Sequence, residues 1–354
     1  MTEQDGPRVI WTWSAEDLAR LATFLGDLGL VGGPVTARAI GDGHANLTYL
    51  VGDGEREVVV RRPPPPPIPR GANDMLREAR LMEALAGTGV PVPTVLAVGQ
   101  AGDVLDVPFY VMSYMKGIVF TDATPPALAS PPVRRELAEA LIDTLAALHA
   151  VDWRARGLQD FGRPEDFNAR HLARMTRLIA DAAGQPPPAF APLAEWLAAN
   201  VPPESGAAIL HNDFRLGNVM LAAEPPGRVE AVLDWELATI GDPLLDVAYF
   251  LASYPQGDAP RTPTEDLARA LLEDGYPRRE ELAQRYARAT GRDLSGLLWH
   301  TALVQYKLAA LYEHSHRRAV AGVGDQYYAD AGLVPRFLDA GHRAIGYTPT
   351  AASA

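Results

Sequence analysis

The chain of 354 residues changes its pattern of apolar side chains near Met115, and this change limits the folds open to it. Before that point, short runs rich in β-branched residues alternate with Gly-containing turns, which is typical of antiparallel strands. The runs are VTARAIG, NLTYLVG and REVVVR between residues 35 and 61, then PTVLAVG and VPFYVMSYM. Ser14 and Asp17 predict a capped helix that lies against this sheet, and a later helix carries Glu78.

Beyond Met115 the apolar residues follow helical spacing in Ala- and Leu-rich segments. The segments expected to form helices are 132–149, 165–183, 189–199, 262–275, 279–290, 294–319 and 330–345. Short strands are expected at AAIL (207–210), paired with NVML (218–221), and at VEAVL (229–233). The sequence therefore predicts an α+β chain with an antiparallel-sheet N-lobe over 1–113 and a mostly helical C-lobe over 114–354.

The composition limits the partners of the chain. A formal net charge of −12 opposes attraction to a phosphate backbone, so no nucleic acid is expected as a partner. The absence of cysteine excludes disulfides, thiolate nucleophiles and thiolate metal ligands. No apolar run is long enough to span a membrane, and the polar start MTEQDGPRVIW lacks the features of a signal peptide. We therefore expect no membrane partner and a cytoplasmic location.

Polar residues interrupt the C-lobe at HNDFRLGNVML, residues 211–221, and again at LDWE. His211, Asp213 and Asn218 have the spacing H-x-D-x-x-x-x-N of a kinase catalytic loop, in which His211 would brace the loop. Asp234 follows the next predicted strand. Carboxylate and amide oxygens suit Mg²⁺ beside substrate phosphates. The pattern predicts phosphoryl transfer in which Asp213 accepts the hydroxyl proton, while Asn218 and Asp234 hold Mg²⁺.

The same stretch, with VLDWELATIGDPLLDVAYF after it, resembles the aminoglycoside phosphotransferase family of small-molecule kinases over nearly the whole chain. GDGHANLTYLV, PFYVMSYMKG and GLQDFGRPEDF resemble more narrowly a kinase-like branch related to the N-terminal domains of some acyl-CoA dehydrogenases. The resemblance implies a protein-kinase-like bilobal fold and the use of ATP or GTP with Mg²⁺. The implied partners are the nucleotide and a small molecule with a hydroxyl group, and the oligomeric state stays open.

The resemblance also implies an ion pair in the N-lobe. Glu78 takes the place of the glutamate on the helix after the third strand, and Arg61 stands where its lysine partner is expected. Arginine keeps a permanent charge and could still bridge Glu78 to the nucleotide phosphates, with a geometry that differs from that of lysine. This replacement is the main departure from the pattern of the family.

Three further sites of nucleotide contact are implied by the resemblance. The backbone N–H groups of residues 43–46 are expected at the phosphates, and Asn46 either contacts the nucleotide or fixes its turn. The segment from Met112 through Tyr114 to Lys116 is expected to be the hinge between the lobes that reads the adenine. Outside the nucleotide site, Asp246 is expected to anchor the catalytic loop by hydrogen bonds.

Two other activities remain compatible with these residues. One is a nucleotide-binding protein of kinase fold without turnover, because Arg61 replaces lysine. The other is a metal-dependent hydrolase that uses His211, Asp213 and Asp234. It leaves Asn218 and Glu78 unexplained. For a kinase, aminoglycosides, macrolides, choline, homoserine and hydroxyacyl-CoA compounds are all candidate acceptors. The narrower resemblance favours a hydroxy acid or its CoA ester.

Overall fold

The computed structural model describes residues 12–41, 46–64, 73–259 and 261–347. The contacts within the chain define two compact units. Unit 1 contains the chain up to Lys116 together with Arg156–Leu158 and Glu230–Ala238, and unit 2 contains the remainder. The expected domain boundary after residue 113 stays a prediction. The contacts group the later segment that contains Asp234 with unit 1.

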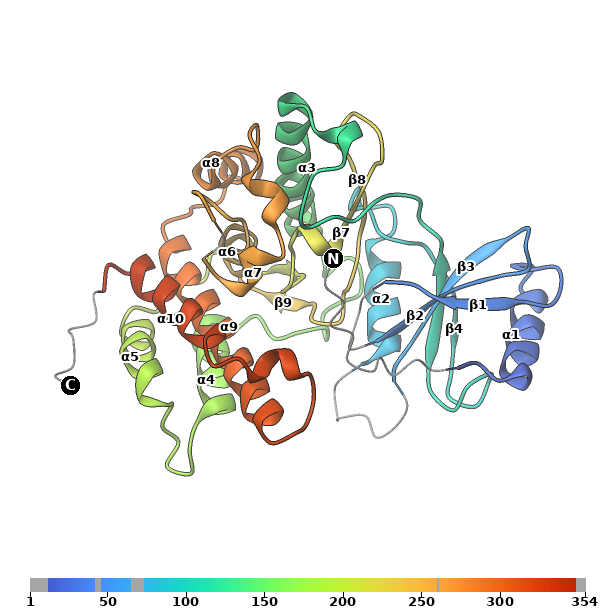
Figure 1. Cartoon of the computed structure of the whole chain (residues 1–354), viewed down its shortest axis with the longest axis horizontal. Coiled ribbons are helices and arrows are strands. Elements are labelled where there is room, and N and C mark those ends of the chain that lie inside the picture. The colour runs from blue at the N-terminus through green and yellow to red at the C-terminus, as the bar shows by residue number, and fades with distance from the viewer. Residues whose placement is uncertain (1–11, 42–45, 65–72, 260, 348–354) are drawn as a thin grey trace. The chain divides into compact units, whose positions relative to one another are not determined.

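Unit 1 is built on a five-stranded antiparallel sheet with the order β1-β2-β3-β5-β4 (Figure 1). Its strands are β1 (Thr36–Ala39), β2 (Leu47–Gly52), β3 (Glu57–Arg62), β4 (Val95–Gly99) and β5 (Phe109–Ser113). The five strands predicted from the sequence are therefore confirmed. In the register of β3 with β5, Arg61 pairs with Tyr110, so alternate side chains of the two strands share one face at this point.

Two helices accompany the sheet of unit 1. The first, α1 (Ala15–Asp27), begins at the predicted capping box, in which the Asp17 N–H group donates to Ser14 Oγ at 3.0 Å. Its Leu21 and Leu25 are fully buried in one apolar cluster with sheet residues, so the predicted packing of this helix on the sheet is confirmed. Each such leucine contributes about 1.5–3 kcal/mol through burial. The second helix, α2 (Met75–Leu85), carries the buried Glu78.

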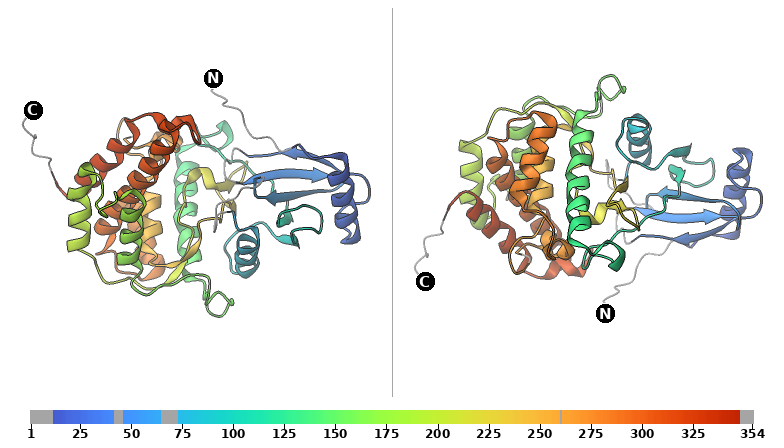
Figure 2. Two further views of the ribbon diagram at one scale, coloured as in Figure 1. Left: turned by 90° about the horizontal axis from the view of Figure 1, so that it is seen from below. Right: turned by 90° about the horizontal axis from the view of Figure 1, so that it is seen from above.

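Unit 2 is mostly helical, as predicted. The α-helices are α3 (Pro131–Ala150), α4 (Phe167–Ile179), α5 (Ala191–Ala199), α6 (Leu244–Ala252), α7 (Pro263–Asp266), α8 (Arg279–Thr290), α9 (Leu297–Val320) and α10 (Leu333–Ala344). Short 3₁₀ helices are η1 (Pro126–Leu128), η2 (Pro188–Phe190), η3 (Leu216–Asn218), η4 (Arg269–Leu272) and η5 (Gln326–Ala329). The core gathers around α9, whose Leu303 and Tyr306 are buried with Leu245 of α6 and Phe337 of α10. The helices α9 and α10 run side by side (Figures 1 and 2).

Two details of unit 2 correct the sequence analysis. The strand β6 (Ala208–Leu210) pairs with β9 (Thr239–Gly241), with Ile209 opposite Ile240, and the predicted pairing with β7 (Val219–Leu221) is wrong. The β9 strand has only three residues and no alternating pattern, so it could not be predicted from the sequence. The predicted helix 262–275 is two short helices, α7 and η4, because the chain leaves helical geometry at Ala268. The remaining strand, β8 (Val229–Val232), begins in unit 2 and ends in unit 1.

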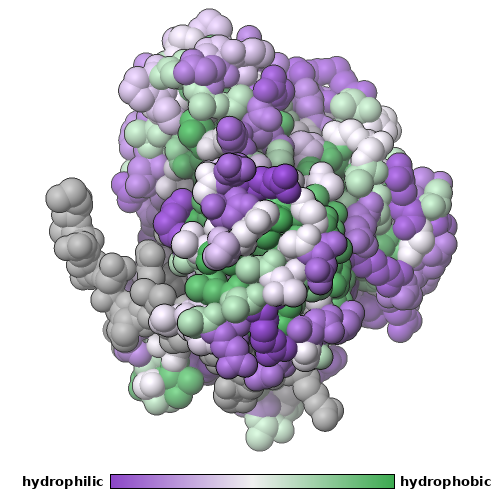
Figure 3. All heavy atoms as spheres, turned by 90° about the vertical axis from the view of Figure 1, so that its right-hand side faces the viewer, coloured by the Kyte–Doolittle hydropathy of each residue, from purple (hydrophilic) through white to green (hydrophobic). Residues whose placement is uncertain are grey.

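Large apolar side chains are exposed at several positions of the described residues. Within the described ranges, no helix is both long and apolar enough to cross a membrane. Hydrophilic and hydrophobic residues are interspersed on the face drawn in Figure 3. Exposed large apolar side chains such as Leu28 and Leu96 are ordinary on a folded domain and need no partner to explain them.

Candidate active site

A buried carboxylate holds the loop that carries the predicted catalytic aspartate. The loop leaves β6 at His211, and Asp246 of α6 accepts hydrogen bonds from the backbone N–H groups of His211 (2.6 Å) and Asn212 (2.8 Å). His149 Nε2 lies 3.5 Å from the same carboxylate, and both side chains are fully buried. Burial raises the pKa of Asp246, but the His149 and His211 interactions outweigh it and lower that pKa overall. The predicted anchoring role of Asp246 is confirmed.

The side chain of Asp213 is held from three directions. The Asn218 amide donates from Nδ2 to Asp213 Oδ2 at 2.7 Å and to the Asp213 backbone oxygen at 2.9 Å. The Tyr249 hydroxyl donates to Asp213 Oδ1, and the Arg215 Nε lies 3.4 Å from that oxygen. An ionised carboxylate has about four acceptor positions, so each oxygen can still accept another hydrogen bond. The carboxylate is therefore held in one orientation, and some of its acceptor positions remain available for a further hydrogen bond.

A buried lysine donates a hydrogen bond to the backbone of this loop. Lys307 of α9 is 4% exposed, and its ammonium group donates to the Asn212 backbone oxygen at 2.9 Å. The same group lies 5.0 Å from the centre of the Tyr249 ring, in reach of a cation–π interaction. Burial lowers the pKa of Lys307 to about 8, against the opposing charges of Asp213 and Asp246. The lysine thus connects the loop backbone with the tyrosine that holds Asp213.

A second polar cluster lies within unit 1, around Arg61. Its Nε lies 3.1 Å from Glu78 Oε2, and its Nη2 lies 2.7 Å from Asp234 Oδ1. The Tyr110 hydroxyl donates to Glu78 Oε2 at 3.0 Å. Burial raises the pKa of the Glu78 carboxyl, and the charge of Arg61 opposes that shift. The arginine therefore balances two carboxylates in a site where its own side chain is only 14% exposed.

Asn46 joins this cluster from the turn before β2. Its Nδ2 donates to Glu78 Oε1 at 3.1 Å and to Glu236 Oε2 at 2.8 Å. Its Oδ1 accepts a hydrogen bond from Asn73 at 2.7 Å. These contacts connect Asn46 with α2 and with the segment after Asp234, and both roles predicted for Asn46 stay predictions.

The remaining predicted positions lie in or next to β5. Met112 is buried beside Val59 of β3, and Tyr114 is partly exposed beyond the end of β5. Their role as a hinge at the adenine stays a prediction. Residues 43–45, expected at the phosphates, lie outside the described residues. The structure thus groups Arg61, Glu78 and Asp234 within unit 1 and Asp213 with Asn218 within unit 2.

Sequence reasoning missed several members of these clusters. Tyr249 and Lys307 lie on apolar helices, where their spacing looks like that of core residues. Tyr110 could have been found from the antiparallel register, because it lies directly opposite Arg61. Glu236 follows Asp234 by two residues in LDWE, but only the fold shows that it meets Asn46.

The buried Lys307 gives a prediction for stability. Its folded-state pKa of about 8 lies below the ordinary value of 10.5, so the unfolded chain binds more protons between these two values. The free energy of unfolding of the wild type, measured relative to Lys307→Met, should therefore rise as the pH increases from 8 towards 10.5. The total rise should be at most about 3.4 kcal/mol. Denaturant titrations of both proteins across this pH range measure it.

The chain offers a matched control, because Lys116 is its only other lysine and is exposed. Lys116→Met makes the same substitution at an exposed position and should leave the pH dependence of the wild type unchanged. A pH dependence that is the same for the wild type and Lys307→Met would contradict the assignment of a depressed pKa to Lys307.

Comparison with known proteins assigns this chain to a family. Residues 36–282 match the model of the phosphotransferase enzyme family. The chain is 33% identical over 305 residues to acyl-CoA dehydrogenase family member 10 of Mus musculus, a match that covers 83% of this chain and 28% of that protein. It is 34% identical over 284 residues to member 11 of Homo sapiens, covering 79% of this chain and 36% of that protein. The chain thus spans about a third of the length of these relatives.

Solved structures agree with the fold. A putative aminoglycoside phosphotransferase from Ralstonia eutropha JMP134 is 28% identical, with a TM-score of 0.78 over 94% of this chain and 99% of that chain. A thermostable aminoglycoside phosphotransferase mutant, in ternary complex with AMP-PNP and hygromycin B, is 18% identical, with a TM-score of 0.61 over 95% of this chain and 100% of that chain. The latter likeness concerns the fold alone. The chain belongs to the phosphotransferase enzyme family and has its protein-kinase-like α+β fold.

Proposed function

We propose that this protein transfers the γ-phosphoryl group of ATP, with Mg²⁺, to a hydroxyl group of a small molecule. Membership of the phosphotransferase family supports phosphoryl transfer to a small molecule in general. The observation that carries the finer proposal is the setting of Asp213. Its carboxylate is oriented by Asn218 and Tyr249 and retains acceptor positions for the proton of an incoming hydroxyl.

In this mechanism Asp213 receives the proton of the acceptor hydroxyl as the hydroxyl oxygen attacks the γ-phosphorus. The bond from that phosphorus to the bridging oxygen breaks, and ADP leaves with the electron pair. The contacts of Asp246 with the loop backbone keep Asp213 in place without contacting the substrate. Most of the catalysis then comes from positioning and charge, as expected for phosphoryl transfer.

The donor atoms available on Asn218 and Asp234 fit Mg²⁺. Both hydrogen bonds that Asn218 makes through its side chain use Nδ2, which leaves its Oδ1 without a hydrogen bond among the described residues. The side chain of Asp234 is 35% exposed, so its carboxylate is accessible. Oxygen donors of this kind are those that Mg²⁺ takes beside phosphates. When bound, the ion neutralises charge on the transferred group.

Arg61 is proposed to perform the task of the lysine usual in kinases. Its ion pair with Glu78 fixes the guanidinium, and the fork of an arginine can bind a phosphate with two parallel hydrogen bonds. Arg61 also contacts Asp234, so the cation that would bind phosphate lies beside a residue that would hold the metal. The cluster therefore supports nucleotide binding in spite of the replaced lysine.

The first test of the proposal is the metal dependence of nucleotide binding. Wild-type protein should bind ATP more tightly with Mg²⁺ than without it. In the presence of Mg²⁺, Asp234→Asn should bind ATP at least about tenfold more weakly than the wild type, because the substitution removes a charged metal ligand. Isothermal titration of both proteins, with and without Mg²⁺, measures this difference. Asp27→Asn, at an exposed site in α1, makes the same change of charge and should behave as the wild type.

The outcomes also separate the alternatives. Equal Mg²⁺-dependent binding by wild type and Asp234→Asn would refute the metal role of Asp234. Binding without any transfer to acceptors would favour the kinase-fold protein without turnover. Cleavage of phosphoesters in the absence of nucleotide would favour a metal-dependent hydrolase.

The charges around Asp213 bear on the class of acceptor. Arg215 lies beside the carboxylate, and Lys307 supports the adjacent backbone. Cations at this position oppose a polycationic acceptor such as an aminoglycoside and favour a neutral or anionic one. We therefore propose a hydroxy acid or its CoA ester as the acceptor. The names of the acyl-CoA dehydrogenase relatives support this choice.

Substitution of Arg215 tests the acceptor class. Arg215→Gln should raise the KM for an anionic hydroxy acid about tenfold, through loss of one charge-assisted contact, and change the KM for a neutral alcohol much less. Steady-state kinetics with a matched pair of a hydroxy acid and its amide measure this. A preference of the wild type for aminoglycosides over both compounds would contradict the proposed acceptor.

A further inference from the structure

A hollow of about 510 Å³ opens on unit 2, away from the residues discussed above. Its lining consists of Arg261, just before α7, and three residues of α10, which are Arg336, Asp339 and Arg343. The volume lies within the range of sites for small ligands. Three arginines around one carboxylate are unexpected in a chain with a net charge of −12.

The arginines of this hollow are incompletely neutralised. Arg336 is held in place, because its Nη1 pairs with Asp266 at 2.9 Å and its Nε donates to the Arg261 backbone oxygen at 3.0 Å. Within the described ranges, the side chains of Arg261 and Arg343 form no ion pair and no hydrogen bond. Asp339 is the only carboxylate in the described lining. The hollow therefore carries an excess of positive charge.

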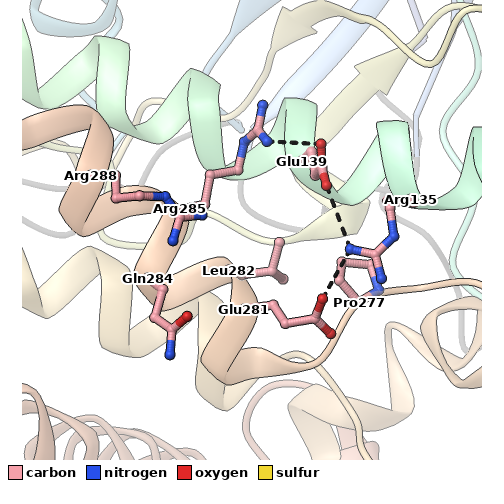
Figure 4. A pocket seen from close by; sticks show the side chains of 8 residues that line it. All are labelled: Arg135, Glu139, Pro277, Glu281, Leu282, Gln284, Arg285 and Arg288. Carbon is pink, nitrogen blue, oxygen red and sulfur yellow. Dashed lines mark hydrogen bonds and ion pairs between the residues drawn. The ribbon is translucent and has the colours of Figure 1, made fainter.

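A second hollow of unit 2 provides a contrast. It is also lined by three arginines, on α3 and α8, but its ion pairs are extensive (Figure 4). Arg285 pairs with Glu139 at 2.8 Å and with Asp143 at 2.7 Å. Arg135 pairs with Glu139 at 3.6 Å and with Glu281 at 3.0 Å. That cluster joins two helices, whereas the hollow on α10 leaves two guanidinium groups available.

Charges of the hollow and of the candidate catalytic loop act on two neighbouring tyrosines of unit 2. The ring of Tyr327 lies 5.2 Å from that of Tyr328, centre to centre. Burial raises the pKa of Tyr327, and the charge of Arg336 opposes that shift. Burial likewise raises the pKa of Tyr328, and the charge of Arg215 opposes that shift.

We propose that the hollow formed by Arg261, Arg336 and Arg343 binds a phosphate-type oxyanion. The planar guanidinium groups match the oxygens of a phosphate, and Arg336 is already fixed by Asp266. The anion has two possible sources. It is either a phosphate group carried by the acceptor at a distance from its hydroxyl, or a free phosphate or diphosphate. The first source rests on the proposed kinase function, and the site itself does not.

Titration with diphosphate at low ionic strength, without Mg²⁺ or nucleotide, tests the site. Wild-type protein should bind one diphosphate here. Arg343→Gln should weaken this binding about tenfold, through the loss of charge-assisted hydrogen bonds, and adding Arg261→Gln should weaken it further. Asp339→Asn should strengthen it, because the variant removes the one opposing charge of the lining. Neither unpaired arginine supports the fold, so these variants should remain folded.

Arg288→Gln is the matched control, because Arg288 lines the second hollow and the charge change is the same. This variant should bind diphosphate as the wild type does. Unchanged binding in the Arg261→Gln, Arg343→Gln double variant, or no binding by the wild type, would overturn the proposal.

Kinetics then distinguish the two sources of the anion. If the acceptor carries it, diphosphate should compete with the acceptor, and the double variant should raise the KM for acceptors that bear a phosphate while leaving phosphate-free acceptors unaffected. If the anion is free, the variants should leave the KM of both kinds of acceptor unchanged and still lose diphosphate binding. Because the titration needs neither nucleotide nor turnover, failure of the site and failure of the kinase proposal are separate results.

Discussion

The proposed chemistry depends first on one buried carboxylate, that of Asp246. It accepts two backbone N–H groups of the catalytic loop, which would otherwise be unsatisfied in the interior of unit 2. Two short hydrogen bonds to successive residues define the path of the backbone, and this path sets the direction in which Asp213 leaves the loop. A charge with no exposure is tolerated there because His149 lies beside it and the backbone dipoles point at it.

The cluster in unit 1 also balances charges away from water, but here one cation lies between two carboxylates. Glu78 and Asp234 would repel each other if both were ionised, and Arg61 between them removes that cost. Lysine has one ammonium group, whereas the guanidinium offers separate nitrogens to the two carboxylates. The replacement of lysine by arginine therefore supports the arrangement, and the polar hydroxyl of Tyr110 completes it.

Local patterns were sufficient to predict most of the fold and part of the site. The strands of unit 1 followed from alternating β-branched runs with clear turns, and the long helices of unit 2 followed from their apolar spacing. The spacing of His211, Asp213 and Asn218 identified the loop, because these residues are close together in the sequence and their order can be read without knowing the fold. The roles of these residues, and those of Met112 and Tyr114, stay predictions.

Contacts between distant segments could not be predicted. The pairing of β6 with β9 depends on a strand of three residues, which leaves no periodic pattern. Lys307 lies in an apolar helix almost a hundred positions after Asn212, so only the packing of α9 reveals their contact. The excess charge around Arg343 likewise appears only when α10 and the segment before α7 lie together.

The proposed function depends most on transfer of the phosphoryl group with Asp213 as the general base. The most direct measurement is a single-turnover reaction with Mg²⁺ and ATP radiolabelled in the γ-phosphate, using a panel of hydroxy acids and their CoA esters. Wild-type protein should move the label onto a hydroxyl of an acceptor, and Asp213→Asn should slow this step by roughly 10²- to 10⁴-fold, the usual contribution of a general base. Transfer at the same rate by both proteins, or release of the label only as inorganic phosphate, would contradict the account.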